Sequence, residues 1–290
     1  MIFAPKSVQA HEMIYLDNNA TTHALPEVIR AVADTLEHYP GNPSSAHSVG
    51  TAARKMLESA REKIAAGFGV SEASQVIFTS SGTESINTAF SLLMRKNIAQ
   101  IVLSSVEHSA VLQAATRWAD GRTIRHVPVS SDGILDLDVL NRHITASPSL
   151  VSLSLANNET GVISDIHAAA QICRRSGALL HVDAVQAAGK IPLNLAELDC
   201  DAASLAAHKF HGPPGCGILF LSTPNLRQLA GHPLLPGHQE HGLRGGTQNL
   251  PAIVGTAVAV ESLRDCASRL AAVSALCIDV SKATTSRTET

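Results

Sequence analysis

Five short and almost continuous apolar runs recur along the chain. They occupy residues 75–79, 101–104, 150–154, 179–183 and 217–221. Runs of this kind are typical of strands buried on both faces, which occur in parallel or mixed sheets that helices cover. Between the runs, apolar residues recur at helical spacing, as in Val28, Val32 and Leu36. This alternation predicts an α/β protein with a mostly parallel central sheet.

The amino-acid composition and the distribution of charge argue against several classes of function. The 290 residues include 22 basic and 25 acidic side chains, and no basic stripe or polybasic helix indicates binding to nucleic acid or to a membrane surface. Residues 1–13 lack the apolar core of a signal peptide, and the apolar stretch 252–260 is too short to cross a bilayer. Five scattered cysteines, with no CxxC spacing, favour a reducing compartment. We therefore expect a soluble cytoplasmic protein.

Polar residues follow the predicted strands at the edge where ligands bind in sheets of this class. The first strand is followed by Ser81, Gly82, Thr83, Glu84 and Ser85. Ser81 and Glu84 have capping-box spacing, and Gly82 lets backbone N–H groups approach an anion. With hydroxyls at Thr83 and Ser85, the segment could hold a phosphate or could simply be a capped helix start.

The other strand ends carry groups that suit a cofactor. His108 could stack on a planar ring or be an ordinary loop residue, and Asn157 and Asn158 could bind a cofactor oxygen or form a turn. Asp183 ends one strand and is followed by Gln186, while His208 and Lys209 precede a turn rich in glycine and proline. The sequence therefore predicts a cofactor pocket at this edge.

A lysine and a strand-end carboxylate are the two groups that pyridoxal phosphate (PLP) requires. The lysine forms a Schiff base with the cofactor, and the acid keeps the pyridine nitrogen protonated so that the ring withdraws electrons. Taken alone, Lys209 could be a surface lysine and Asp183 a helix cap. The whole set of strand ends favours PLP.

A metal site is the main alternative to a cofactor pocket. His208 and His211 lie three residues apart, as do His238 and His241. The sequence contains no HExxH motif and no histidine cluster bracketed by carboxylates, so we expect no metal.

Nine segments together resemble a known family, the class V (fold-type I) PLP enzymes, and within it the cysteine desulfurases of the NifS/IscS type. They are residues 15–22, 41–47, 78–85, 106–108, 157–161, 181–190, 208–217, 237–240 and 243–249. The resemblance implies a fold-type I large domain over residues 14–262. Residues 263–290 would begin a smaller C-terminal domain that is incomplete.

The resemblance also implies roles for residues around the cofactor ring. Lys209 would bind the cofactor and move protons between it and the substrate carbon. Asp183 would pair with the pyridine nitrogen, Gln186 with the phenolic oxygen, and His108 would stack on the ring. Lys209 and His108 are thus the expected catalytic residues.

Further residues would bind the rest of the cofactor. Thr83 and His208 would hold the phosphate beside Gly82, and Asn158 would lie against cofactor and substrate. Thr247 would reach the phosphate of a neighbouring subunit, which implies a homodimer with shared active sites. Ala206 stands where the family often has a phosphate-binding serine, which would weaken cofactor binding by about 1 kcal/mol.

The implied reaction converts L-cysteine to L-alanine and passes the sulfur, as a persulfide, to an acceptor such as an iron–sulfur scaffold protein. In the family, the nucleophilic cysteine and a carboxylate-binding arginine lie beyond the last matching segment, and this chain ends before either. Packing is the better interpretation for each cysteine present: Cys173, Cys200, Cys216, Cys266 and Cys277. One alternative is a truncated, catalytically impaired paralogue that binds PLP and dimerises with a full-length partner. Another is sulfur or selenium transfer to an external thiol.

Overall fold

The computed structural model describes residues 14–94, 97–145, 147–222, 233–265, 268 and 270–275. Its centre is a seven-stranded sheet. The strands are β1 (Val76–Thr79), β2 (Gln100–Ser104), β3 (Thr123–Val127), β4 (Ser149–Ser154), β5 (Leu179–Asp183), β6 (Ala202–Ala206) and β7 (Gly217–Leu221). The five predicted strands are confirmed, and β6 coincides with the apolar run before Lys209.

The sheet is mixed but mostly parallel, in the order β1-β7-β6-β5-β4-β2-β3. From β6 to β3 every neighbouring pair is parallel, whereas β7 runs antiparallel to both β6 and β1. Because β7 is reversed against both of its neighbours, β1 points the same way as the other five strands. The carboxyl ends of six strands therefore lie at one edge of the sheet.

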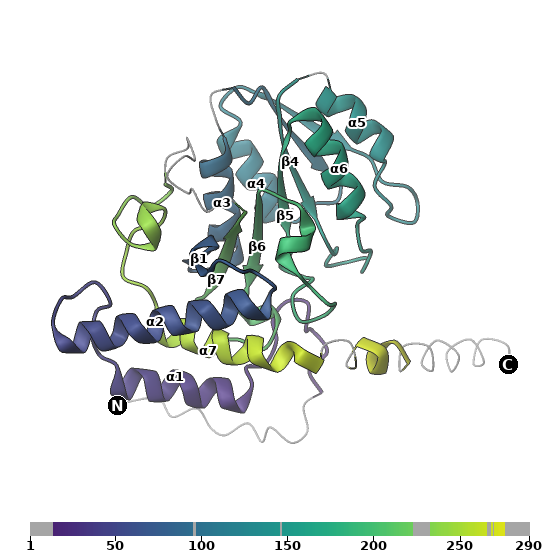
Figure 1. Ribbon diagram of the computed structural model, residues 1–290. Helices are drawn as coiled ribbons and strands as arrows, with labels where there is room; N and C mark the ends of the chain where they lie inside the picture. The colour runs from purple at the N-terminus through teal and green to yellow at the C-terminus, as the bar shows by residue number, and fades with distance from the viewer. Residues whose placement is uncertain are drawn as a thin grey trace, which may run out of the picture.

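Helices cover both faces of this sheet (Figure 1). They are α1 (Pro26–His38), α2 (Ser48–Gly67), α3 (Gly82–Leu93), α4 (Ser109–Trp118), α5 (Leu137–Thr145), α6 (Ile166–Ser176) and α7 (Leu250–Glu261). Side chains alternate along each strand between two cores. Ile77 of β1 packs with α3 and α4, while Val76 and Phe78 pack in the core shared by the other helices.

Helix α7 differs from its prediction. The apolar spacing predicted one amphipathic helix over residues 250–277, but α7 ends at Glu261 and a 3₁₀ turn follows at Ser262–Asp265. The helix is buried on most sides because it packs against both α1 and α2, and the three run side by side in Figure 1. A Cβ at Gly255 would lie 2.7 Å from Cγ2 of Val32, so α1 and α7 approach closely only with glycine there.

Several expectations fall on segments that the structure does not describe. Residues 1–13, Cys266, Cys277 and most of the predicted smaller domain over 263–290 are among them. Within the described part of the chain, no helix is both long and apolar enough to span a membrane.

Candidate functional site

A cavity of about 210 Å³ lies at the edge where the strands end. Eight of the nine residues predicted to bind the cofactor line it: Gly82, Thr83, His108, Asn158, Asp183, Gln186, His208 and Lys209. The ninth, Thr247, is exposed and lies outside the lining, with its hydroxyl 3.4 Å from Nδ2 of Asn42. The strand ends that the sequence predicted to lie together therefore meet in one cavity. Thr247 was expected to reach the phosphate of a neighbouring subunit, and that expectation stays a prediction.

The N-terminus of α3 closes one side of the cavity. The Ser81 hydroxyl caps the helix by accepting a hydrogen bond from the Glu84 N–H (3.1 Å), and Glu84 in turn accepts from the Ser80 N–H (2.7 Å). Backbone N–H groups in the first turn have no partner within a helix, and Gly82 and Thr83 line the cavity, so this turn can serve as an anion site. The Ser85 hydroxyl is not available, because it is buried against Oγ1 of Thr79 at 2.7 Å.

Lys209 lies in a 3₁₀ turn directly after β6. Its Nζ donates to the backbone oxygens of Asn19 and Ala20, the latter at 2.9 Å. Burial lowers the pKa of this amine, and the charges of Asp183 and Asp17 oppose the shift. A lysine with a lowered pKa gives up its proton more readily, as a nucleophilic amine must.

Asp183 ends β5 and is only 6% exposed. One carboxylate oxygen, Oδ1, accepts a hydrogen bond from the Val185 N–H at 3.0 Å. Burial raises the pKa of this carboxyl group, while the hydrogen bond from the Val185 N–H and the positive charge of Lys209 lower it. A buried carboxylate that lines a cavity is stabilised by a cationic partner, and a protonated pyridine is such a partner.

His108 serves both the helix and the cavity. It is the N-cap of α4, and its Nδ1 accepts a hydrogen bond from the Ala110 N–H at 3.1 Å. Since Nδ1 accepts, the neutral ring carries its proton on Nε2. The cap fixes the ring at the cavity wall. The two asparagines in the loop after β4 differ in a similar way. Asn157 forms a turn by accepting from the N–H groups of Glu159 and Thr160, and Asn158 lines the cavity.

The segment 17–22 lies over the lysine. Thr22 donates from its backbone N–H to the carbonyl oxygen of His208 at 2.8 Å, and the Thr21 hydroxyl lies 3.1 Å from Nδ1 of His208. The Asn19 carbonyl accepts from both Lys209 and Gln186, and its side chain donates to the Asn158 carbonyl at 2.9 Å. Reasoning from residue types gave Asn19 no role, although it belongs to a segment that carries the family resemblance.

The described cysteines are buried and lie outside the cavity lining. They are Cys173, Cys200 and Cys216. Burial raises the pKa of each thiol to about 12. A thiol with this pKa carries almost no thiolate near neutral pH, which disfavours a nucleophilic role for these three residues. The packing interpretation of these residues therefore agrees with the structure.

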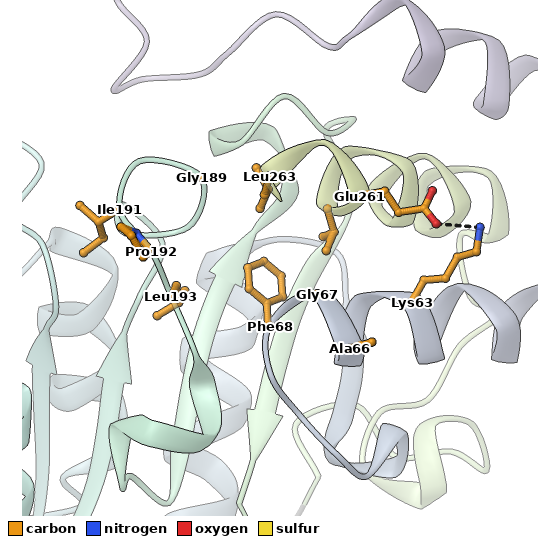
Figure 2. A pocket seen from close by; sticks show the side chains of 11 residues that line it. Lys63, Ala66, Gly67, Phe68, Gly189, Ile191, Pro192, Leu193, Glu261 and Leu263 are labelled. Carbon is orange, nitrogen blue, oxygen red and sulfur yellow. Dashed lines mark ion pairs between the residues drawn. The ribbon is translucent and has the colours of Figure 1, made fainter. Parts of the chain in front are cut away.

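A second cavity, of about 370 Å³, lies between α2, the end of α7 and residues 189–193. Figure 2 shows apolar side chains such as Phe68 and Leu193 around it. Its charged residues, Lys63 and Glu261, pair with each other at 3.0 Å. The groups suited to catalysis converge in the first cavity. Among the described residues, no group of three or more histidine, cysteine or acidic side chains could hold a metal ion.

The comparison with known families agrees with this geometry. The family model described as "Aminotransferase class-V" matches residues 14–276. The chain belongs to the aminotransferase class-V family. Members of this family depend on PLP, in agreement with the cofactor that the strand ends predict.

The relatives of this chain include cysteine desulfurases and a NifS-like protein of known structure. A cysteine desulfurase from Nostoc sp. is 43% identical over 253 residues, which cover 86% of this chain and 62% of that protein. A solved NifS-like protein has a TM-score of 0.82 and 39% identity, covering 88% of this chain and 71% of the other. A structure of SspA in complex with cysteine has a TM-score of 0.80 and 29% identity, with coverage of 86% and 72%. The chain thus spans 62% of the length of the Nostoc cysteine desulfurase.

The residues of the cavity fit PLP. A Cβ at Gly82 would lie 3.0 Å from Cγ2 of Val185 and 3.3 Å from Cβ of Ala206, so glycine keeps the approach to the α3 N-terminus open for a phosphate. Asp183 would face the pyridine nitrogen and Lys209 the aldehyde carbon. The cavity therefore offers an anion site, a carboxylate and an amine, the three groups that PLP needs.

Proposed function

We propose that this chain is the PLP-binding part of a cysteine desulfurase, which converts L-cysteine to L-alanine and transfers the sulfur to a thiol. The observation that carries the proposal is the convergence of Lys209, Asp183 and the α3 N-terminus in one cavity. The relatives that are cysteine desulfurases indicate the reaction, and a bound cysteine in the SspA structure supports the substrate. The overall reaction balances, because L-cysteine and a thiol together yield L-alanine and a persulfide.

PLP would supply a ring that withdraws electrons and so stabilises negative charge at a substrate carbon. Lys209 would take a proton from that carbon and return one, and burial favours its neutral form. Asp183 would hold a proton on the pyridine nitrogen by its negative charge. His108 would stack on the ring, and Thr83 and His208 would bind the phosphate.

The sulfur acceptor is proposed to lie outside the three described cysteines, because Cys173, Cys200 and Cys216 are buried away from the cavity. We also propose a homodimer in which Thr247 reaches the partner's phosphate site, a cytoplasmic location, and sulfur delivery to an acceptor such as an iron–sulfur scaffold. Residues 14–262 would form the PLP-binding domain and residues 263–290 would begin a smaller one.

The test is alanine release from L-cysteine by purified protein loaded with PLP, with a thiol reductant present. We expect a visible absorption band from the bound cofactor and alanine formation, and Lys209→Ala should remove both. A band that persists in Lys209→Ala would contradict the lysine assignment. If PLP binds through Lys209 but no alanine forms, the desulfurase proposal for this chain is wrong and its function is limited to cofactor binding.

A further inference from the structure

Lys190 lies beside the site without lining it. It ends the turn that follows β5, four residues after Gln186, and its side chain is half-buried. Its Nζ donates to Oδ1 of Asn19 at 2.8 Å and to Oε1 of Gln186. Neither the strand-end pattern nor the family resemblance gave this lysine a role.

The contacts of Lys190 fix the orientation of two side-chain amides. An ammonium group only donates hydrogen bonds and a backbone carbonyl only accepts them, so each identifies the amide atom that it meets. Gln186 meets Lys190 with its oxygen and the Asn19 carbonyl with Nε2 at 2.9 Å. Asn19 meets Lys190 with Oδ1 and the Asn158 carbonyl with Nδ2, also at 2.9 Å.

This orientation turns the donor end of Gln186 toward the catalytic lysine. The Asn19 carbonyl accepts from Nε2 of Gln186 and also from Nζ of Lys209, so these two nitrogens are neighbours. An amide nitrogen carries two N–H groups, and the Asn19 carbonyl engages one of them. The other remains for a group bound at Lys209. If the amide were reversed, an oxygen would face that group instead.

We propose that Lys190 is a positioning residue that holds the Gln186 amide so that it presents an N–H donor to the group bound at Lys209. This inference rests on the proposed function, in which Gln186 meets the phenolic oxygen of PLP. The charged or titratable groups around the two lysines are Asp17, Asp183, His108 and His208. None of these four residues is altered by a substitution at Lys190.

The experiment follows the visible absorption of this chain, loaded with PLP, as a function of pH. The pH midpoint of the absorption change reports protonation of the link between Lys209 and the cofactor. A donor to the phenolic oxygen and a nearby positive charge both disfavour the protonated link, so Lys190→Met should raise the midpoint by about 0.5 to 1 pH unit. Lys190→Arg keeps charge and donors and should stay close to the wild-type midpoint. Lys63→Met, which removes a lysine from the second cavity, is the matched control.

A double-variant comparison separates positioning from charge alone. Lys190→Met should raise the midpoint less in a Gln186→Leu protein than in the wild type, because the amide that it orients is gone. Equal shifts in both backgrounds, or no shift in Lys190→Met, would overturn the inference. If Lys190→Met does not fold, Lys190→Gln gives the same comparison. Absence of any Lys209-dependent absorption in the wild type would instead overturn the proposed function.

Discussion

Glu107 is a buried carboxyl group that bonds to Ser154, a residue of the cavity lining. It is 7% exposed, and its two oxygens accept from the Ser154 N–H (3.0 Å) and the Ser154 hydroxyl (2.6 Å). Burial raises its pKa from 4.5 to about 7, although the bonds from Ser154 oppose the shift. The folded state therefore binds this proton more tightly than the unfolded state. The resulting stability is complete below about pH 4.5 and is lost as the pH rises through about 7.

We predict that Glu107→Gln removes this pH dependence. Between about pH 4.5 and about pH 7, the free energy of unfolding of the wild type should fall relative to that of the variant by up to about 3 kcal/mol. Urea unfolding of both proteins across this range measures the difference. Glu159→Gln, which changes an exposed carboxylate, should follow the wild type. Parallel pH profiles for the wild type and Glu107→Gln would contradict the prediction.

Buried cysteines give a second prediction for single residues. Cys173, Cys200 and Cys216 have thiol pKa values of about 12, raised by burial, and the thiolate is the form that reacts with alkylating agents. In the native protein at about pH 8 we expect iodoacetamide to leave all three unmodified, and in urea to modify all three. Peptide mass mapping reads each site separately. Rapid native labelling of Cys216 would show that it is accessible and would return it as a candidate nucleophile.

At the scale of elements, the start of α3 makes the site depend on one glycine. A methyl group at Gly82 would be crowded between Val185 and Ala206 at the floor of the cavity. Gly82→Ala should weaken PLP binding about tenfold, which corresponds to about 1.4 kcal/mol, with little loss of fold stability because alanine favours helix. Ala206→Ser adds a hydroxyl at the same floor and should strengthen binding by up to about fivefold. PLP titrations followed by absorption measure both, and unchanged affinity in Gly82→Ala would refute the role of the α3 N-terminus.

The elements that the sequence predicts well are those whose burial is uniform. The five apolar runs are buried along most of their length, so their composition alone identifies them. The edge strand β3 was missed because Thr123, Arg125 and His126 are exposed, which breaks the apolar pattern. The length of α7 was overestimated because its burial between α1 and α2 depends on tertiary packing rather than on one apolar stripe.

At the scale of the whole molecule, some residues of the site could be placed from local sequence patterns, whereas others come together only when the chain folds. Strand ends share one edge in any parallel sheet, so Asp183, His208 and Lys209 could be placed together from local patterns. Asn19 and Lys190 could not, because they meet across 171 residues and only the folded chain brings them together. Ser85 shows the opposite case: its position allowed a role at the phosphate site, but its side chain packs against Thr79.

A buried ion pair also joins segments that lie far apart in the sequence. The Glu240 carboxylate accepts from Nη1 of Arg61 at 2.7 Å and from the Phe78 N–H at 2.9 Å, which links α2, β1 and the segment that carries Thr247. Both side chains are at most 3% exposed. Although burial alone would raise the pKa of Glu240, hydrogen bonding to Arg61 holds it below the ordinary value. The carboxylate is therefore charged in the folded state and depends on Arg61 for its counter-charge.

Arg61→Met should destabilise the protein by about 3 to 5 kcal/mol, because it leaves the Glu240 charge buried without its cation. Glu58→Gln is the matched control: Glu58 also pairs with Arg61, at 3.0 Å, but its side chain is 51% exposed, so its loss should cost at most about 1 kcal/mol. Urea unfolding at neutral pH measures both. Equal effects of the two substitutions would show that the pair with Glu240 does not hold these segments together.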